Sequence, residues 1–418
     1  MLCFLLIVKK IKKSEKEDSK NTAKERLHLV LAQDRANISA DFLELMKQEI
    51  SNLAKEKKEE FEKVSDYIFA NPELAFKEYK SQEALCKLLE SHGFVVKRGI
   101  AEMPTSFEAV FDSGKPGKTV ALMGEYDCLP EIGHGCGHNL IGTSAAGAGI
   151  VLKEVMEKHE IGGVLKVLGT PAEEKGSGKA IMVRHGVFEG IDAALLMHPC
   201  DESMPDDISF AAITLEFTFK GKPAHAAACP WKGANALSGV QLMFHAVDMM
   251  RLHFKDYSRV HGIITEGGVA HNTITDEAKA VFNIRSLEYD YMMEMVDAIR
   301  DCAKGAAIAT RTEVEERQVD EVVKDVRNDK KLVQYVRKNM DFIGEKYIER
   351  DLTQGIGSTD VGNVTHEIPA IQFYVKLKEH VGTHTKEFAV AAGGEEGKRN
   401  LHASVQLLAM SALDVLSE

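Results

Sequence analysis

The segment MGEYDCLPEIGHGCGHNL places metal-binding side chains in a glycine-rich loop directly after a run of apolar residues. Cys136 and His138 are two positions apart, and a glycine on each side of Cys136 lets the backbone turn both side chains toward one point. Thiolate and imidazole are ligands that zinc and related divalent ions prefer. On its own such a Cys-x-His pair is more often structural or accidental, so a metal site needs further ligands.

Three other segments offer ligands or acid–base groups. TPAEEKGSG contains the adjacent carboxylates Glu173 and Glu174, which can divide metal ligation and proton transfer between them. His198 closes the apolar run LLMHP, and His384 lies in GTHTKEF near the C-terminus. Taken singly, the acidic pair is usually just solvated, His198 is more often a core histidine, and His384 is uninformative.

Together the four segments indicate a metal site, because most of the polar residues follow successive strand patterns that an α/β sheet would bring to one edge. Glu173 would remain free beside the metals. The set predicts a co-catalytic metal hydrolase in which a bridging water becomes acidic and a carboxylate removes its proton. The five candidate metal ligands are Cys136, His138, Glu174, His198 and His384.

The elements that must position these residues alternate between helix and strand patterns. From about Ile50 to Gly93, apolar residues recur at spacings of three and four, which predicts two amphipathic helices broken at Asn71-Pro72. Strand patterns follow in TSFEAVFDS, KTVALMGEYD, GGVLKVLGTP and IDAALLMHP, with a helix of small residues over 142–158. This order predicts an α/β catalytic domain with a mostly parallel sheet and helices on both faces.

In the middle of the chain the order of predicted elements changes to βαββαβ. It begins with the strand AAITLEFTFKG and ends with the strand RTEVEERQVD. This order matches the split βαβ, ferredoxin-like unit, which folds as a compact body of its own. The expected parts are a charged N-terminal extension over 1–49, a catalytic domain over 50–207 and 323–418, and an inserted domain over 208–322.

Composition limits the class of partner. The 418 residues are 44% hydrophobic and 28% charged, and 52 Lys and Arg against 64 Asp and Glu give a net charge of −12. A chain this acidic is a poor candidate for binding nucleic acid or an anionic membrane, so a small molecule is the favoured partner. Seven cysteines without a repeated spacing fit a reducing cytoplasm. The apolar start MLCFLLIV is too short to span a bilayer, and its basic residues follow it, which argues against a signal peptide.

In order and spacing these motifs resemble the two-metal aminoacylase and carboxypeptidase-like metallopeptidases. The branch they are most similar to is that of the amidohydrolases acting on p-aminobenzoyl-glutamate, Xaa-Arg dipeptides and indole-acetyl amino acids. The resemblance implies two divalent ions, which can be zinc, manganese, cobalt or nickel, and an inserted domain that serves as lid and dimerisation domain. It runs from about Ile50 to the C-terminus through NPEL, GEYDCLPEIGHGCGHNLIG, PAEE, MHP, KGKPAHAA, GGVAHNTITDEA, STDVGNV and HTKEF.

By position, the resemblance implies a role for each residue of the metal site. Cys136 would bridge the two metals, and Glu173 would act first as general base and then as general acid. Asp127 would orient a metal ligand, as side chains behind metal sites do. The remaining ligands would be His138, Glu174, His198 and His384.

The resemblance also assigns residues of the inserted domain. His225 of KPAHAA resembles a histidine that reaches the partner subunit's active site and stabilises the tetrahedral oxyanion, which requires a homodimer. Asn272 and Arg285 match positions that contact substrate, and an arginine can pair bidentately with a substrate carboxylate. A surface or core histidine at 225, and a plain salt bridge at Arg285, are the alternatives.

Two departures bear on the substrate. Asn139 and Glu125 stand where many relatives have aspartate, so this part of the chain differs from the auxin-conjugate type. Asn139 followed by Leu-Ile-Gly instead looks like the aminobenzoyl-glutamate and dipeptidase branch. The resemblance therefore implies a metal-dependent amidohydrolase that cleaves the amide bond of a dipeptide or N-acyl amino acid with a free carboxylate. The alternatives are an exopeptidase on longer peptides and a non-catalytic, metal-binding scaffold of the same fold.

Overall fold

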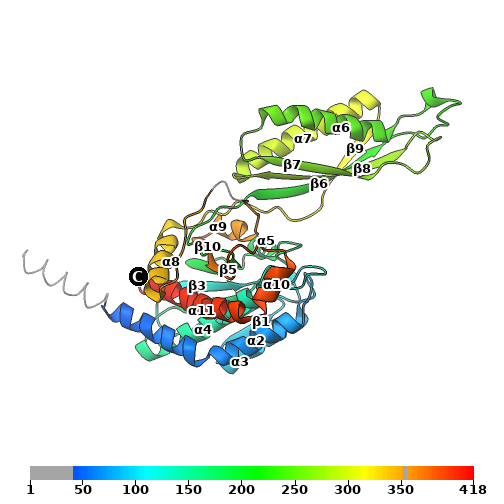
Figure 1. Cartoon of the computed structure of the whole chain (residues 1–418). Helices are drawn as coiled ribbons and strands as arrows, with labels where there is room; N and C mark the ends of the chain where they lie inside the picture. The colour runs from blue at the N-terminus through cyan, green and yellow to red at the C-terminus, as the bar shows by residue number, and fades with distance from the viewer. Residues whose placement is uncertain (1–40, 352–354) are drawn as a thin grey trace, which may run out of the picture. The chain divides into compact units, whose positions relative to one another are not determined.

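The computed structural model describes residues 41–351 and 355–418 (Figure 1). The chain divides into two units, one ending at Asn52 and one spanning Leu53–Glu418. Of the first unit, the structure describes residues 41–52, which are helical. Across the described ranges, no helix has both the length and the apolar character needed to cross a membrane.

A six-stranded sheet forms the centre of the domain that the sequence predicts to be catalytic, in the order β1-β2-β4-β3-β5-β10. Strand β2 pairs antiparallel with both of its neighbours, β1 and β4. The pairs β4–β3, β3–β5 and β5–β10 are parallel, so β2 is the one strand of this sheet that runs in the opposite direction. The predicted mostly parallel sheet is thus confirmed. Its strands are β1 (Val95–Arg98), β2 (Phe107–Asp112), β3 (Thr119–Gly124), β4 (Val164–Gly169), β5 (Ala193–Cys200) and β10 (Ala370–Lys376).

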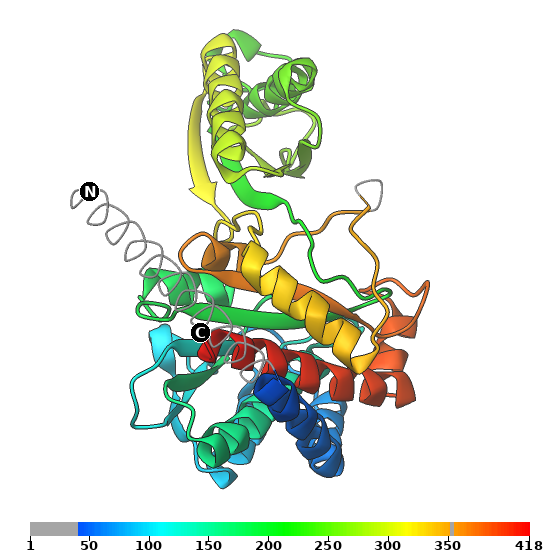
Figure 2. The same ribbon diagram turned by 90° about the vertical axis from the view of Figure 1, so that its left-hand side faces the viewer.

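Helices cover both faces of this sheet, as expected. In Figure 1, α4 and α11 lie on one side of the strands and α5 and α9 on the other. Figure 2 shows α8 alongside α11, so the last part of the chain returns to complete the domain. The helices are α2 (Lys58–Ala70), α3 (Tyr79–Ser91), η1 (Ile100–Glu102), α4 (His138–His159), α5 (Gly178–Arg184), α8 (Lys330–Ile343), α9 (Val361–Thr365), α10 (Lys386–Ala392) and α11 (Glu395–Leu416).

Helix α4 begins at His138, four residues before the predicted start at 142, so the predicted boundary was wrong. The helix continues through small residues because it packs closely on the strand beside it. A Cβ added at Gly142 would lie 2.8 Å from the carbonyl oxygen of Glu125, a distance that forces a shift. Glycine at this position therefore lets the start of α4 approach the end of β3, where the candidate ligands are.

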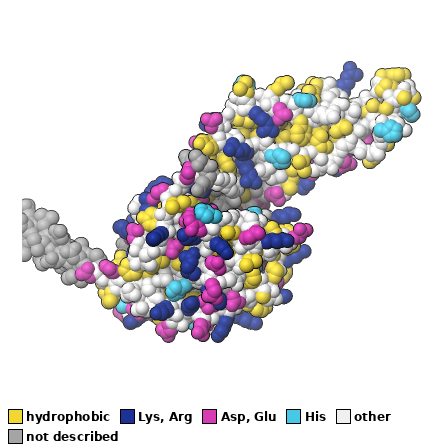
Figure 3. All heavy atoms as spheres, in the orientation of Figure 1, with side chains coloured by type: hydrophobic (Ala, Val, Ile, Leu, Met, Phe, Trp, Pro, Cys, Tyr) yellow, Lys and Arg dark blue, Asp and Glu magenta, His cyan; other side chains and the backbone are white. Residues whose placement is uncertain are grey.

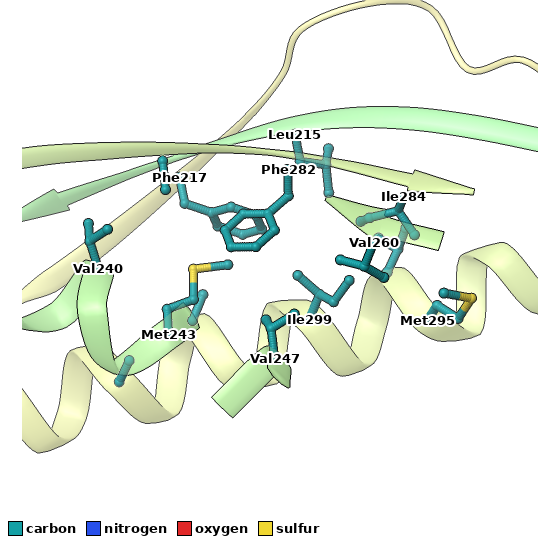
Figure 4. Packing of buried hydrophobic residues seen from close by; sticks show 14 of the residues in the cluster. Leu215, Phe217, Val240, Met243, Val247, Val260, Phe282, Ile284, Met295 and Ile299 are labelled. Atoms are coloured by element: carbon teal, nitrogen blue, oxygen red, sulfur yellow. The ribbon is translucent and has the colours of Figure 1, made fainter. Parts of the chain in front are cut away.

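The inserted domain has the predicted βαββαβ order and an antiparallel sheet in the order β7-β8-β6-β9. Alternate residues of β6 are buried, and Figure 4 shows Leu215 and Phe217 packed with Phe282, Val240 and Met243 between the sheet and its two helices. The elements are β6 (Ala211–Lys220), η2 (Pro230–Lys232), α6 (Ala236–Met250), η3 (Arg251–His253), β7 (Arg259–Glu266), β8 (Glu277–Ser286), α7 (Tyr289–Thr310) and β9 (Glu313–Gln318).

Candidate metal centre

The loop between β3 and α4 brings the first two candidate ligands into the interior. Cys136 is 7% exposed and His138, the first residue of α4, is fully buried. Gly137 between them has a φ of +76°, and a Cβ there would lie 2.6 Å from Cγ of Pro199. Only glycine satisfies both conditions, so the Cys-Gly-His sequence is needed to point the two side chains inward.

The loop after β4 supplies the two adjacent glutamates. Ala172, directly before them, has a φ of +62°. The carboxylate of Glu174 lies between two histidines, with Oε1 3.7 Å from Nε2 of His138 and Oε2 3.6 Å from Nε2 of His384. Glu173 groups with His138 and Glu174 and also belongs to a second cluster of acids. The adjacent carboxylates therefore have different surroundings.

All five predicted ligands come together, and they form two overlapping groups. In each group the ligand atoms lie within 4.8 Å of one another. Cys136 belongs to both groups, and its Sγ is 3.4 Å from Nε2 of His198. The groups are Cys136, His138 and His198, and Cys136, Glu174 and His384.

The unpaired polar atoms of this cluster fit divalent cations. Nε2 of His138 and Oε1 of Glu174 are buried and have no hydrogen-bond partner among the described residues. Buried polar atoms are rarely left unpaired, so atoms that face each other at 3.7 Å indicate a ligand between them. A set of thiolate, imidazole and carboxylate suits zinc and the neighbouring divalent metals.

Hydrogen bonds on the far side of the candidate ligands orient them. Nδ1 of His138 donates to Oδ1 of Asp127 at 2.9 Å, and Oδ2 of Asp127 accepts from the backbone N–H of Glu174 at 3.0 Å. Burial would raise the pKa of Asp127, but the adjacent His138 holds it below its usual value. Nδ1 of His198 donates to the carbonyl of Pro199 at 2.7 Å, and burial lowers the pKa of His198 to about 4. Both Nε2 atoms are therefore directed at the site.

A buried lysine that the sequence analysis missed lies behind Glu173. Nζ of Lys179 is 2.5 Å from Oε1 of Glu125 and 2.6 Å from Oδ1 of Asp360, and Lys179 is fully buried. Carboxylate oxygens of Glu125, Glu173 and Asp360 lie within 4.8 Å of one another. Burial, then Glu125 and Asp360, raise the pKa of Glu173 well above its usual value. In the sequence, Glu125 stood out only as a departure that bears on the substrate, and no local pattern pointed to Lys179.

The side chain of Asn139, the other departure, bonds to groups other than the candidate ligands. Its Nδ2 donates to Oγ of Ser65 at 3.0 Å and to the carbonyl of Ala392 at 3.2 Å. The side chain is buried and ties α4 to α2 and α10. This substitution therefore acts on packing behind the site.

A cavity of about 770 Å³ opens onto the cluster and is lined by Glu173, Glu174, His198 and residues of the inserted domain, among them Arg285. Nε of Arg285 donates to Oδ1 of Asn283 at 2.7 Å, and Nη1 lies 3.4 Å from Oγ of Ser358. No carboxylate of the described chain forms an ion pair with this guanidinium, so the salt-bridge alternative finds no support there.

His225 and Asn272 are not brought to this cavity. Both are exposed, and their loops pair with each other, since the N–H of Ala226 donates to the carbonyl of Asn272 at 3.0 Å. Within the described residues, neither side chain contacts a candidate ligand. His225 is thus no core histidine, and it lies on a different part of the subunit from Glu173.

Two family models match different parts of the chain. A model described as the septum formation topological specificity factor MinE matches residues 4–56, which include most of the expected N-terminal extension. A model described as a peptidase dimerisation domain matches residues 209–311, which include most of the inserted domain.

Relatives match a much larger part of the chain. The Xaa-Arg dipeptidase of Mus musculus is 32% identical over 392 residues, which cover 90% of each chain. One of the p-aminobenzoyl-glutamate hydrolase subunits of Escherichia coli (strain K12) is 40% identical over 271 residues, covering 60% of this chain and 56% of its own. The solved structure of a dinuclear metal-binding peptidase of the M20 family from Bacillus subtilis superposes with a TM-score of 0.68 at 18% identity and covers 87% of this chain and 99% of its own. These matches confirm the resemblance, and the chain belongs to the M20 amidohydrolase family.

Proposed function

We propose that the chain hydrolyses the amide bond of a dipeptide or an N-acyl amino acid that has a free carboxylate. Membership of the family makes it a metal-dependent amide hydrolase, whereas the substrate and the role of each residue are our proposal. The observation that supports it best is the pair of ligand groups that share Cys136, next to the partly buried carboxylate of Glu173. The five ligands would hold two divalent ions, with zinc, manganese, cobalt and nickel all compatible.

In this proposal the ions held by the five ligands would supply a more acidic water and would polarise the amide carbonyl. Glu173 accepts a proton from the water as it attacks and later donates that proton to the departing amine. A carboxyl whose pKa is raised by burial and neighbouring acids suits a group that must hold and return a proton. Asp127 keeps the ring of His138 oriented throughout.

Arg285 supports the choice of substrate. It lines the cavity with hydrogen-bond partners that are uncharged, so its charge is available to a substrate carboxylate. The mouse and bacterial relatives are named for substrates that contain arginine or glutamate, and an amino acid at the C-terminal end of such a substrate has a free carboxylate. We therefore expect the leaving group to be an amino acid.

We expect the purified, metal-loaded protein to release a free amino acid from a dipeptide or from p-aminobenzoyl-glutamate, and a chelator to abolish this release. The panel adds an N-acyl amino acid and a tetrapeptide, and amino acid release is quantified with and without chelator. Faster turnover of the tetrapeptide would favour the exopeptidase alternative. No turnover and no bound metal would favour a non-catalytic scaffold.

We further propose a homodimer in which His225 serves the partner's active site. The match to a peptidase dimerisation domain and the exposed position of His225 away from its own cavity support this arrangement. A Glu173→Gln protein mixed with a His225→Ala protein should recover about a quarter of wild-type activity after random subunit exchange, because half the dimers are mixed and each has one complete site. The rate is compared with that of each variant alone, and no gain after verified exchange would contradict action in trans.

The remaining partner and location assignments are proposals of the same kind. The site residues all belong to the unit Leu53–Glu418, so we assign the enzyme to that unit and not to the segment similar to MinE.

On the face seen in Figure 3, acidic and basic side chains are interspersed, which suits a small-molecule partner better than nucleic acid. We also propose a cytoplasmic location, with which the six unpaired cysteines of the described residues are compatible.

A further inference from the structure

The segment NPELAFKE, residues 71–78, packs against the loop that contains Glu173 and Glu174, and the mechanism above does not use it. Glu78 at its end is fully buried. Its Oε1 accepts hydrogen bonds from the backbone N–H groups of Phe76 and Ala172, each at 2.9 Å. One carboxylate oxygen therefore ties this segment to the residue directly before Glu173.

Both residues that bond to Glu78 have a strained backbone. Ala172 has a φ of +62° and Phe76 a φ of +61°, a region that residues with a Cβ rarely adopt. A second contact follows close by, since a Cβ added at Gly176 would lie 2.3 Å from the ring of Phe76. The loop is thus held at both ends, at Ala172 by a hydrogen bond and at Gly176 by close packing.

The conformation of Ala172 decides where the two following side chains point. Glu174 is directed at His138 and His384, while Glu173 also lies with the acids behind the site. The N–H of Glu174 is itself bonded to Asp127. If Ala172 relaxed to an ordinary negative φ, the chain direction at this point would change and both carboxylates would move.

We propose that Glu78 is a positioning residue of the active site, whose carboxylate holds Ala172 in the left-handed conformation that aims Glu173 and Glu174 in different directions. This inference rests on the roles proposed for those two glutamates. Glu73, in the same segment, has a different role. Its carboxylate accepts hydrogen bonds from the backbone N–H groups of Lys80 and Ser81 at the start of α3. Glu73 therefore acts on the stability of a helix end.

The test compares Glu78→Leu, which removes the acceptor at similar size, with Glu78→Gln, whose amide oxygen can accept the same two hydrogen bonds. We expect Glu78→Leu to lower kcat on the order of 100-fold with a nearly unchanged KM, as a displaced catalytic group does. Glu78→Gln should stay close to wild type. Metal content should also fall in Glu78→Leu, since Glu174 is displaced from the ligand group of Cys136 and His384.

A second substitution separates positioning from general stability. Glycine adopts a positive φ without strain. Ala172→Gly added to Glu78→Leu should therefore raise kcat at least about tenfold above that of Glu78→Leu alone, and should restore metal content. The control Glu73→Ala should lower Tm and leave kcat and metal content unchanged. If Glu78→Leu does not fold, Glu78→Asp, whose shorter side chain cannot reach both N–H groups, takes its place.

Equal metal content in the Leu and Gln variants, or no restoration by Ala172→Gly, would overturn the proposal. Metal content is measured without substrate, so it answers the question even if the wild-type protein hydrolyses nothing in the panel. A failure of the proposed function and a failure of this inference can therefore be told apart.

Discussion

Glu173→Gln should lower kcat by about 10²–10⁴-fold, the range that a general acid–base group contributes, while two metal ions remain bound. The amide keeps the size of the side chain but cannot take a proton from the attacking water. Because Glu174 and the other ligands keep their positions, metal content should equal that of the wild type. Steady-state kinetics on the best substrate, combined with metal analysis of the same sample, measure both quantities.

The adjacent residue provides a matched control. Glu174→Gln makes the same chemical change one position along the chain. In the wild-type protein, however, the carboxylate oxygens of Glu174 face His138 and His384. We expect this variant to lose metal from the group formed with Cys136 and His384, and activity with it. A Glu173→Gln protein that turns over at the wild-type rate would remove Glu173 from the mechanism, whatever its metal content.

Lys179→Met should destabilise the protein by about 3–5 kcal/mol, the usual cost of leaving buried charges without their partner. The substitution leaves Glu125 and Asp360 fully buried beside Glu173 with no cation between them. Chemical denaturation followed by a signal from the catalytic domain measures the change. Adding Glu125→Gln and Asp360→Asn to the same protein should recover much of the loss, because the acids are then uncharged.

The control for this prediction is a lysine–glutamate ion pair between β4 and β2 of the central sheet. Lys166 lies 2.7 Å from Glu108, and both side chains are partly exposed. Lys166→Met should therefore cost no more than about 1 kcal/mol, as exposed ion pairs do. Equal losses of unfolding free energy in the Lys166→Met and Lys179→Met variants would contradict the prediction. They would show that burial does not determine how strongly the ion pairs of Lys179 stabilise the protein.

Local sequence patterns predicted the fold well because they follow from short-range geometry. The period-two burial of β6 and the recurrent apolar positions of α2 and α3 require only neighbouring residues. The start of α4 was missed because it depends on a close approach between Gly142 and the end of β3, which neighbouring residues do not specify.

The same division holds for the candidate site. The residue types and order of Cys136, His138, Glu174, His198 and His384 indicated a metal site, because the ends of parallel strands meet at one edge of a sheet. That Cys136 belongs to both ligand groups came from the resemblance as an expectation, and its geometry became visible only in three dimensions.

The sequence by itself thus determined the order of the elements and the residue types available for chemistry. Only the tertiary structure decided which buried groups face one another. Lys179 meets Glu125 and Asp360, and Glu78 meets Ala172, across separations of 54, 181 and 94 residues. No local sequence pattern predicts these contacts. A buried charge or a strained φ is tolerated only because interactions with distant residues compensate its cost, and folding alone brings those residues together.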